Sequence, residues 1–233
     1  MIKLKETNLY FGVKRYFESL GFLVRAEVKD IDVCAIKEDL LIGVELKKNL
    51  TVDLLVQGAL RQKVCDLVYI AVPRPKRFKK NREFSNTLHL LRRLELGLLF
   101  VDVDKGMAEE ILEPAYFNLD KARSALVNRR KALLKEIKGR SLSLNQGGSS
   151  RTRLMTAYRE ESLKAVAILL EKGSVAPKDL KELGLKSTIL RDNYYGWFKK
   201  IARGIYVLDD CKIDDYECYG EYISEFRSVL FLM

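Results

Sequence analysis

The sequence predicts an α/β protein in which a mixed β-sheet flanked by helices is followed by a C-terminal winged-helix-like domain. Helical and strand-like segments alternate in the N-terminal half in the order α-β-β-β-α-β-α-β. Residues 66–72 form a continuous apolar run, which is typical of a strand buried on both faces. Residues 154–233 begin with three helical segments and continue into a glycine-containing β segment, which is the outline of a winged helix.

The first helix is expected over residues 6–20. Leu9, Val13 and Phe17 recur at helical spacing, and Gly21 ends the segment. Short strand-like runs follow it, separated by polar pairs at hairpin-like lengths. We expect strands over residues 22–28, 31–37 and 40–47.

A second helix is expected over residues 52–65, where Val56, Leu60 and Val64 form an apolar stripe that we expect to be buried. The buried strand over residues 66–72 follows this helix. A helix over residues 83–95 and a strand over residues 98–103 complete the unit.

The composition changes after about residue 104. Residues 119–138 are basic and helical in pattern, and residues 141–153 are rich in Ser, Asn, Gln and Gly, as is typical of a linker or an ordered loop between two domains. The expected domains are therefore 1–118, a basic helix and linker over 119–153, and a winged-helix-like domain over 154–233.

The net charge of the chain is +10, and a basic excess attracts polyanions. No apolar run is long enough to cross a bilayer, so we expect no membrane partner. Residues 1–6 are charged and contain no apolar signal-peptide region, so we expect a cytosolic location.

The four cysteines form no CxxC pair, and His89 is the only histidine, which argues against a zinc site. Cys34 and Cys65 lie in apolar runs and are expected to be reduced core residues. A disulfide between Cys211 and Cys218 is the less favoured alternative in a cytosolic chain.

Two carboxylates and a lysine form the candidate catalytic group. Glu45 and Lys47 are two residues apart on one predicted strand, so their side chains share a face. Strand pairing can bring Asp32 of the preceding strand close to Glu45. Two carboxylates and a main-chain carbonyl suit Mg²⁺ or Mn²⁺, which can polarise a phosphodiester, and Lys47 can orient a water or stabilise developing charge. The alternative is an ordinary solvated strand face.

Further candidates come from the neighbouring helices. Gln57 and Arg61 are four residues apart and share one helix face that can border the site, where Arg61 can hold a phosphate. Glu18 is a candidate third metal ligand, although a surface position is the favoured alternative. Glu27 and Asp30 are similar candidates.

The C-terminal domain contains a cluster of aromatic residues over 194–198. Aromatic rings can stack on unpaired bases, but they also fill small cores, and core packing is the favoured interpretation. The expected phosphate contacts in this domain are Arg191, Lys199, Lys200 and Arg203.

Asp32, the Glu45-Leu46-Lys47 triplet and Gln57 resemble the PD-(D/E)XK nuclease superfamily, although Ile31 stands where the name-giving pattern has proline. The chain looks like an uncharacterised bacterial branch of PD-(D/E)XK phosphodiesterases. The resemblance extends over residues 27–33, 44–47, 51–55, 71–73, 155–160 and 193–198. It implies a restriction-endonuclease-like core, metal binding by Asp32 and Glu45, and assistance to hydrolysis by Lys47.

We therefore expect a Mg²⁺- or Mn²⁺-dependent nuclease acting on nucleic acid, with DNA as the expected substrate. Two chains would be needed for coordinated double-strand cutting, so a homodimer is one expectation. A nucleic-acid-binding or regulatory protein with an inert nuclease fold is the first alternative, and it predicts salt-dependent binding without cleavage. A protein-interaction domain with incidental charge is the second alternative.

Overall fold

The computed structural model of the protein describes residues 5–142, 145–149 and 152–231. The chain divides into two compact units, Met1–Ala122 and Arg123–Met233. These are called the N-terminal unit and the C-terminal unit below.

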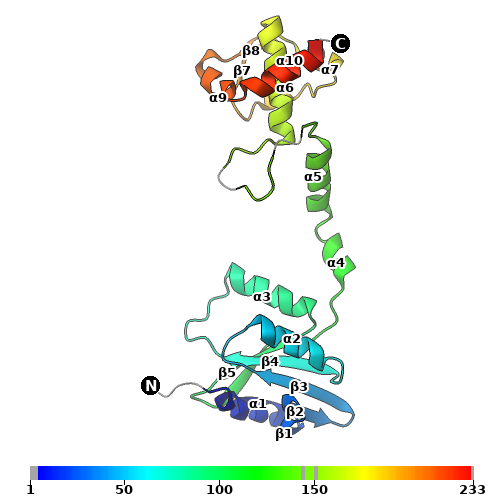
Figure 1. The fold of residues 1–233 in the computed structure, drawn as a ribbon, viewed down its shortest axis with the longest axis vertical. Helices are drawn as coiled ribbons and strands as arrows, with labels where there is room; N and C mark the ends of the chain where they lie inside the picture. Colours follow the sequence, from blue (N-terminus) through cyan, green and yellow to red (C-terminus); the bar gives the residue numbers. More distant parts are fainter. Residues whose placement is uncertain (1–4, 143–144, 150–151, 232–233) are drawn as a thin grey trace. The chain divides into compact units, whose positions relative to one another are not determined.

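The N-terminal unit contains a six-stranded sheet in which the strands lie in chain order (Figure 1). The first three strands form an antiparallel meander, the next two are each parallel to the strand before them, and the last is antiparallel. The strands are β1 Leu23–Val28, β2 Ile31–Lys37, β3 Leu40–Leu46, β4 Leu67–Pro73, β5 Gly97–Asp102 and β6 Met107–Leu112.

Helices cover both faces of this sheet. Helix α1 (Thr7–Ser19) packs on one face, where Phe17 is buried among side chains of β2 and β3. Helices α2 (Val52–Arg61) and α3 (Arg82–Arg93) pack on the other face around Leu54 and Leu91 (Figure 1). A six-stranded mixed sheet flanked by helices fits a restriction-endonuclease-like core, as the sequence predicts.

The buried face of α2 differs from the predicted one. Val56, Leu60 and Val64 are exposed, whereas Leu54 and Gly58 are buried. Gly58 lies in the interface because a Cβ there would come within 3.1 Å of Leu96. The helix turns the side that carries Leu54, Gly58 and Arg61 towards the sheet, and the apolar stripe lies on another side.

Two further differences concern elements whose sequence signal is weak or misleading. Strand β6 was not expected, because its sequence MAEEIL lacks a strong apolar pattern, yet it pairs with β5. The basic helix expected over 119–138 is two helices, α4 (Leu119–Ser124) and α5 (Val127–Lys138), neither of which has a buried residue.

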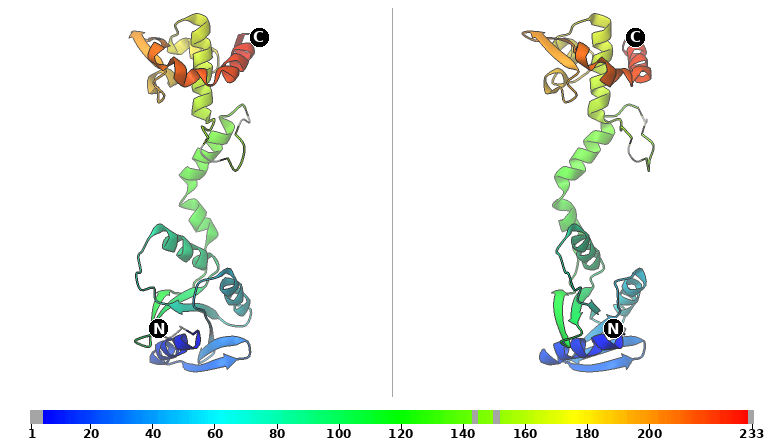
Figure 2. Two further views of the ribbon diagram at one scale, coloured as in Figure 1. Left: turned by 60° about the vertical axis from the view of Figure 1, so that its left-hand side comes forward. Right: turned by 90° about the vertical axis from the view of Figure 1, so that its left-hand side faces the viewer.

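The C-terminal unit is built around the long helix α6 (Ala157–Lys172), whose Leu163 and Ile168 are fully buried. Figure 2 shows α6 between the hairpin on one side and α10 on the other. An isolated antiparallel bridge joins Val175, just after α6, to Tyr206 in the hairpin. The remaining elements are α7 Pro177–Glu182, α8 Ile189–Asp192, β7 Phe198–Ala202, β8 Ile205–Leu208, a 3-10 turn Asp210–Lys212, α9 Ile213–Glu217 and α10 Gly220–Phe231.

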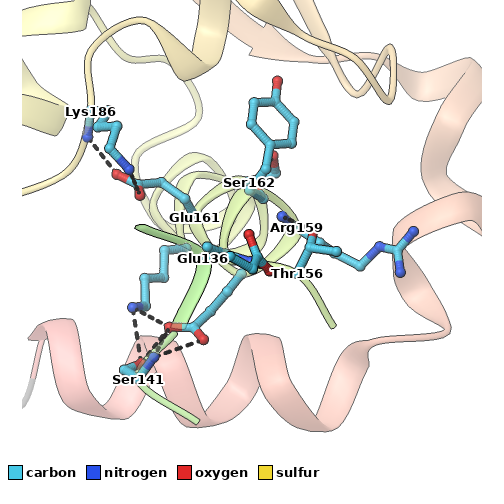
Figure 3. Close-up of polar contacts among 11 residues, drawn as sticks. Glu136, Ser141, Thr156, Arg159, Glu161, Ser162 and Lys186 are labelled. Atoms are coloured by element: carbon cyan, nitrogen blue, oxygen red, sulfur yellow. Dashed lines mark hydrogen bonds and ion pairs between the residues drawn. The ribbon is translucent and has the colours of Figure 1, made fainter. Parts of the chain in front are cut away.

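Side-chain hydrogen bonds hold both ends of the loop that joins α5 to α6. The buried carboxylate of Glu160 accepts hydrogen bonds from the Ser141 backbone N–H and hydroxyl (Figure 3). The Asn145 side chain donates to the Met155 carbonyl at 2.6 Å and accepts from the Met155 N–H at 2.8 Å. The described residues of this serine-rich segment therefore form an ordered loop, which is one of the two alternatives that the sequence left open.

The described residues contain no disulfide. Cys34 and Cys65 are free and buried, as expected, and Cys211 and Cys218 are free and exposed. None of the helices formed by described residues has both the length and the apolar character required to cross a membrane.

Candidate functional site

The register of β2 and β3 brings Asp32 next to Glu45. Val33 pairs with Val44, so the next positions towards the sheet edge are Asp32 and Glu45. The carboxylate Oδ2 of Asp32 accepts a hydrogen bond from the Leu46 backbone N–H at 2.8 Å. This bond ties the Asp32 side chain to the strand that carries Glu45.

The two carboxylates lie on the face of the sheet that α2 covers. On β3, Val44 and Leu46 are buried in the core under α1, and Glu45 between them points the other way, as strand alternation requires. The guanidinium of Arg61 on α2 binds Glu45 from that side. The carboxylates of Asp32 and Glu45 therefore lie on the same side of the sheet.

Glu45 is a buried charged residue, with only 2% of its surface exposed. Its Oε1 accepts a hydrogen bond from Arg61 Nε at 2.6 Å, and Arg61 also binds the carboxylate and carbonyl of Asp30. Burial raises the pKa of Glu45, Arg61 opposes that rise, and the nearby Asp32 carboxylate raises the pKa further. Glu45 therefore holds a proton more readily than an exposed glutamate does. Arg61 and Asp32 shift its pKa in opposite directions.

Lys47 lies just beyond the end of β3, where its backbone N–H donates to the Ala71 carbonyl at 3.1 Å and continues the pairing with β4. Its Nζ lies 3.7 Å from Oε2 of Glu6, immediately before α1. The sequence reasoning missed Glu6, because nothing local connects it with Lys47. Only the packing of α1 against the sheet brings the two together.

Gln57 and Glu18 occupy different environments. Gln57 lies one turn before Arg61 on α2, and its Oε1 is buried without a hydrogen bond from any described residue. Glu18 is exposed on α1, which covers the other face of the sheet, and its Oε1 lies 3.6 Å from Lys14 Nζ. The structure therefore does not bring Glu18 to the Asp32–Glu45 pair.

The donor set can be compared with what a divalent cation requires. Across the described ranges, no group of three or more His, Cys, Asp or Glu side chains is arranged to hold a metal ion. Two adjacent carboxylates and the unpartnered oxygen of Gln57 remain as hard oxygen donors. Mg²⁺ is commonly bound by only one or two carboxylates, with waters and substrate phosphates completing its shell, so this set fits such an ion.

A run of exposed basic side chains follows β4 and was also missed from the sequence. Because β3 and β4 are parallel, with Leu46 paired to Ala71, the ends of both strands lie at the same edge of the sheet. Phe78 anchors the run by packing against Phe84 and Phe100 at ring distances of 4.7 and 5.4 Å. We call this run the basic segment; its exposed cations are Arg74, Lys76, Arg77, Lys79, Lys80 and Arg82.

The expected phosphate contacts of the C-terminal unit are all exposed. Arg191 lies on α8 beside Asp192, with Nη2 3.2 Å from its carboxylate. Lys199 and Lys200 lie on β7, and Arg203 lies in the turn before β8. In the aromatic cluster, Trp197 and Phe198 are buried in the core, as the favoured interpretation predicts, whereas Tyr194 is 79% exposed.

The fold of the N-terminal unit fits one class of protein, the restriction-endonuclease-like α/β proteins. Residues 99–212 match the model of a family described as "Putative PD-(D/E)XK phosphodiesterase (DUF2161)". This match confirms the predicted family and indicates a nuclease-like phosphodiesterase. The matched residues begin in β5, so Asp32, Glu45 and Lys47 precede them. No curated protein and no solved structure matches the chain.

Proposed function

We propose that the N-terminal unit hydrolyses phosphodiester bonds of nucleic acid, with DNA as substrate and Mg²⁺ or Mn²⁺ as cofactor. One observation carries the proposal. Asp32 and Glu45 meet on one face of the sheet, and Lys47 follows two residues after Glu45, just beyond the end of β3. The match of residues 99–212 to a phosphodiesterase family supports the reaction class.

Asp32 and Glu45 are the residues that would hold the ion, with Gln57 as a further oxygen donor. A bound divalent ion supplies Lewis-acid polarisation of the phosphate and lowers the pKa of a water. Oδ2 of Asp32 and Oε1 of Glu45 already accept hydrogen bonds, which fixes the orientation of both carboxylates.

Lys47 would act on the phosphate itself. Its ammonium group is held near Glu6 at the end of β3, two residues after Glu45. A cation at that position can stabilise the charge that develops on the phosphoryl oxygens during hydrolysis. The ion pair with Glu6 orients the Lys47 side chain, so Glu6 is a positioning residue for the reaction.

Arg61 would control access to Glu45. Its guanidinium binds Glu45 on one side and Asp30 on the other. Asp30 is well exposed, so Arg61 can keep this partner while Glu45 turns towards an incoming cation. Arg61 was expected to hold a phosphate, and release from Glu45 would make its donors available for that role.

Several features support nucleic acid as the substrate. The chain carries a net charge of +10, and the basic segment lies at the sheet edge where β3 and β4 end. In the C-terminal unit, the helices α6, α7 and α8, the bridge at Val175 and the β7–β8 hairpin follow the order of a winged helix. We propose that residues 154–233 position DNA for residues 1–118, with Arg191, Lys199, Lys200 and Arg203 as phosphate contacts.

The proposed reaction can be tested with labelled single- and double-stranded DNA and RNA in Mg²⁺ and in Mn²⁺. We expect cleavage of DNA that EDTA abolishes and that falls by about a hundredfold or more in Lys47→Met. Lys48→Met is the matched control, because Lys48 is the exposed neighbour beyond the site. Equal cleavage by Lys47→Met and the native protein would contradict the proposal.

A second function is favoured by the Glu45–Arg61 bond, which occupies one oxygen of a proposed ligand. A protein in which this bond never opens would bind nucleic acid without cleaving it. The same experiments separate the two functions: salt-dependent binding with no cleavage in Mn²⁺ would identify the inert fold.

The basic segment should contribute a salt-dependent part of the affinity for nucleic acid. We expect Lys80→Gln to weaken binding of DNA and to lower the slope of log affinity against log salt by about 0.7 to 0.9, as loss of one phosphate contact does. The double variant Lys79→Gln/Lys80→Gln should lower this slope by about twice as much. The measurement is a fluorescence-anisotropy titration in EDTA at several salt concentrations.

Lys63→Gln serves as the control for this prediction. Lys63 is exposed just after α2, near the start of β4 and therefore at the opposite edge of the sheet. Lys63→Gln removes one positive charge from the N-terminal unit, as Lys80→Gln does. An equal effect of Lys63→Gln and Lys80→Gln would show that net charge, and not the basic segment, determines binding.

A further inference from the structure

A small cavity in the C-terminal unit combines cationic, aromatic and acidic side chains. Its volume is about 230 Å³. This is below the roughly 300–1,000 Å³ of pockets that enclose drug-sized ligands, so a ligand of that size would lie partly outside the cavity. We call it the aromatic cavity; it is lined by Arg153, Arg159, Tyr195, Trp197, Asp215 and Tyr219.

Arg159 is the central cation of the aromatic cavity. It extends from the first turn of α6, and Figure 3 shows it pointing away from the helix in the direction opposite to Glu161. Its guanidinium carbon lies 5.1 Å from the ring centroid of Tyr195 and 5.6 Å from that of Tyr219. Contacts of this kind hold a guanidinium in place by cation–π attraction and leave its N–H edge available.

The hydrogen bonds of Arg159 are incomplete. Its Nη1 donates to the Leu154 carbonyl, but its Nε is buried and has no acceptor among the described residues. A buried donor without a partner is unfavourable, and such groups in native proteins commonly mark a place for a ligand or a water. Arg153 adds a second, exposed guanidinium at the same cavity.

The aromatic wall gives the cavity a flat apolar side. The rings of Tyr195 and Trp197 are stacked, with centroids 4.6 Å apart and planes inclined by 24°. Trp197 is 3% exposed and forms the base of the wall, while Tyr195 is only partly buried. Trp197 and Arg159 both contact the Tyr195 ring, and the exposed part of that ring offers apolar surface against which a base can pack.

Asp215 determines which anion the cavity would accept. Asp215 lines the cavity together with the two arginines, and its Oδ2 lies 3.5 Å from Lys212 Nζ. A bare phosphate would be attracted by the arginines but repelled by Asp215. A nucleotide offers phosphate oxygens to the arginines and N–H or O–H donors of its base or sugar to Asp215.

We propose that the aromatic cavity binds a single phosphorylated nucleoside, either free or as one unit of a single strand. Arg153 and Arg159 would bind the phosphate, the exposed part of Tyr195 would pack against the base, and Asp215 would accept a hydrogen bond from the base or sugar. The site lies in the C-terminal unit and uses none of the residues proposed for hydrolysis, so it stands independently of the nuclease proposal.

Trp197 is the only tryptophan of the chain, so its fluorescence reports directly on the cavity. The full-length protein is titrated in EDTA with the four deoxynucleoside 5′-monophosphates, a short oligothymidylate, deoxyadenosine and inorganic phosphate. We expect saturable quenching by a nucleotide or the oligonucleotide, and at least tenfold weaker binding of deoxyadenosine and inorganic phosphate. Binding of monophosphates identifies a free nucleotide as ligand, and binding of the oligonucleotide alone identifies a strand.

Two variants test the roles of the arginines, with their folding checked by thermal unfolding. Arg153→Gln, which changes an exposed side chain, and Arg159→Gln should each weaken nucleotide binding by about tenfold. Asp215→Asn should reduce the preference for nucleotide over inorganic phosphate. Arg227→Gln, which changes an exposed arginine of the same unit that is paired with Glu171, is the control and should bind as the native protein does.

The proposal is overturned by any of three results. The first is the absence of saturable quenching by every nucleotide and by the oligonucleotide at millimolar concentration. The second is binding of inorganic phosphate as tight as that of nucleotides. The third is native affinity in folded Arg153→Gln; this variant decides the matter if Arg159→Gln does not fold.

Discussion

Replacing Glu45 by Gln is expected to reduce cleavage by on the order of a thousandfold, because the substitution removes the buried carboxylate of the proposed metal pair. Gln has nearly the same shape as Glu, and Arg61 retains Asp30 as a partner. The fold should therefore be preserved. Single-turnover cleavage with saturating Mn²⁺ measures the loss of activity, and calorimetric titration with Mn²⁺ measures the loss of binding.

The same variant has a predictable effect on stability. Burial raises the pKa of Glu45, so the folded state binds a proton more tightly than the unfolded state. The contribution of this group to the free energy of unfolding therefore falls as pH rises from the ordinary glutamate pKa through the raised one. Glu45→Gln removes this pH-dependent loss of stability. At neutral pH the variant should therefore be at least as stable as the native protein.

Glu18→Gln is the control for Glu45→Gln. Glu18 is exposed on α1, away from the acidic pair, so its substitution should leave both cleavage and Mn²⁺ binding unchanged. A large loss of cleavage and Mn²⁺ binding in Glu18→Gln would show that Glu18 is a metal ligand after all. Retention of full activity by Glu45→Gln would remove the basis for the proposed metal site.

Replacing Glu160 by Gln should destabilise the C-terminal unit by on the order of 3 kcal/mol, because it removes one partner of a buried, hydrogen-bonded ion pair. Glu160 has no exposed surface. Its Oε1 lies 2.7 Å from Lys164 Nζ, and its carboxylate binds the Ser141 backbone N–H at 3.0 Å. A neutral amide loses the attraction to Lys164 and presents an N–H group where the backbone of Ser141 also donates.

The pH dependence of this contribution has the opposite sign to that of Glu45. Burial acts to raise the pKa of Glu160, but the bonds from Lys164 and Ser141 outweigh it and lower the pKa. The stabilisation is therefore complete above the ordinary glutamate pKa and is lost as pH falls through the lowered one. Urea denaturation at pH 7 and pH 4, followed by Trp197 fluorescence, measures both effects.

Glu171→Gln provides the matched control on the same helix. Glu171 binds Arg227, and both side chains are 46% exposed. An exposed ion pair contributes at most about 1 kcal/mol. Equal destabilisation by Glu160→Gln and Glu171→Gln would show that the buried network around Ser141 does not stabilise the unit.

The sequence was most informative where local pattern and packing agree. Residues 31–37 were predicted as a strand and form β2 with the same bounds, because apolar residues at the right period coincide with polar turns. The proximity of Asp32 and Glu45 follows from the same hairpin register. In contrast, β6 has little apolar pattern and exists because β5 offers an edge to pair with.

Tertiary contacts could not be derived in the same way. The orientation of α2 depends on Gly58 fitting against Leu96 and on Arg61 reaching Glu45, and no helical periodicity encodes either contact. The approach of Glu6 to Lys47 likewise spans elements far apart in the chain. The aromatic rings around Arg159 also come from distant parts of the chain, because Tyr195 and Tyr219 lie 36 and 60 residues further on.

The sheet topology also bears on how the protein folds. Strands β1, β2 and β3 form an antiparallel meander with tight turns, whereas β4 and β5 are parallel to their predecessors and join the sheet only after helical crossovers. Closing a short loop costs less chain entropy than closing a long one, so the meander can assemble first and the crossovers afterwards. Asp32 and Glu45 would then face each other early in folding, and Arg61 would reach Glu45 only once the α2 crossover has docked.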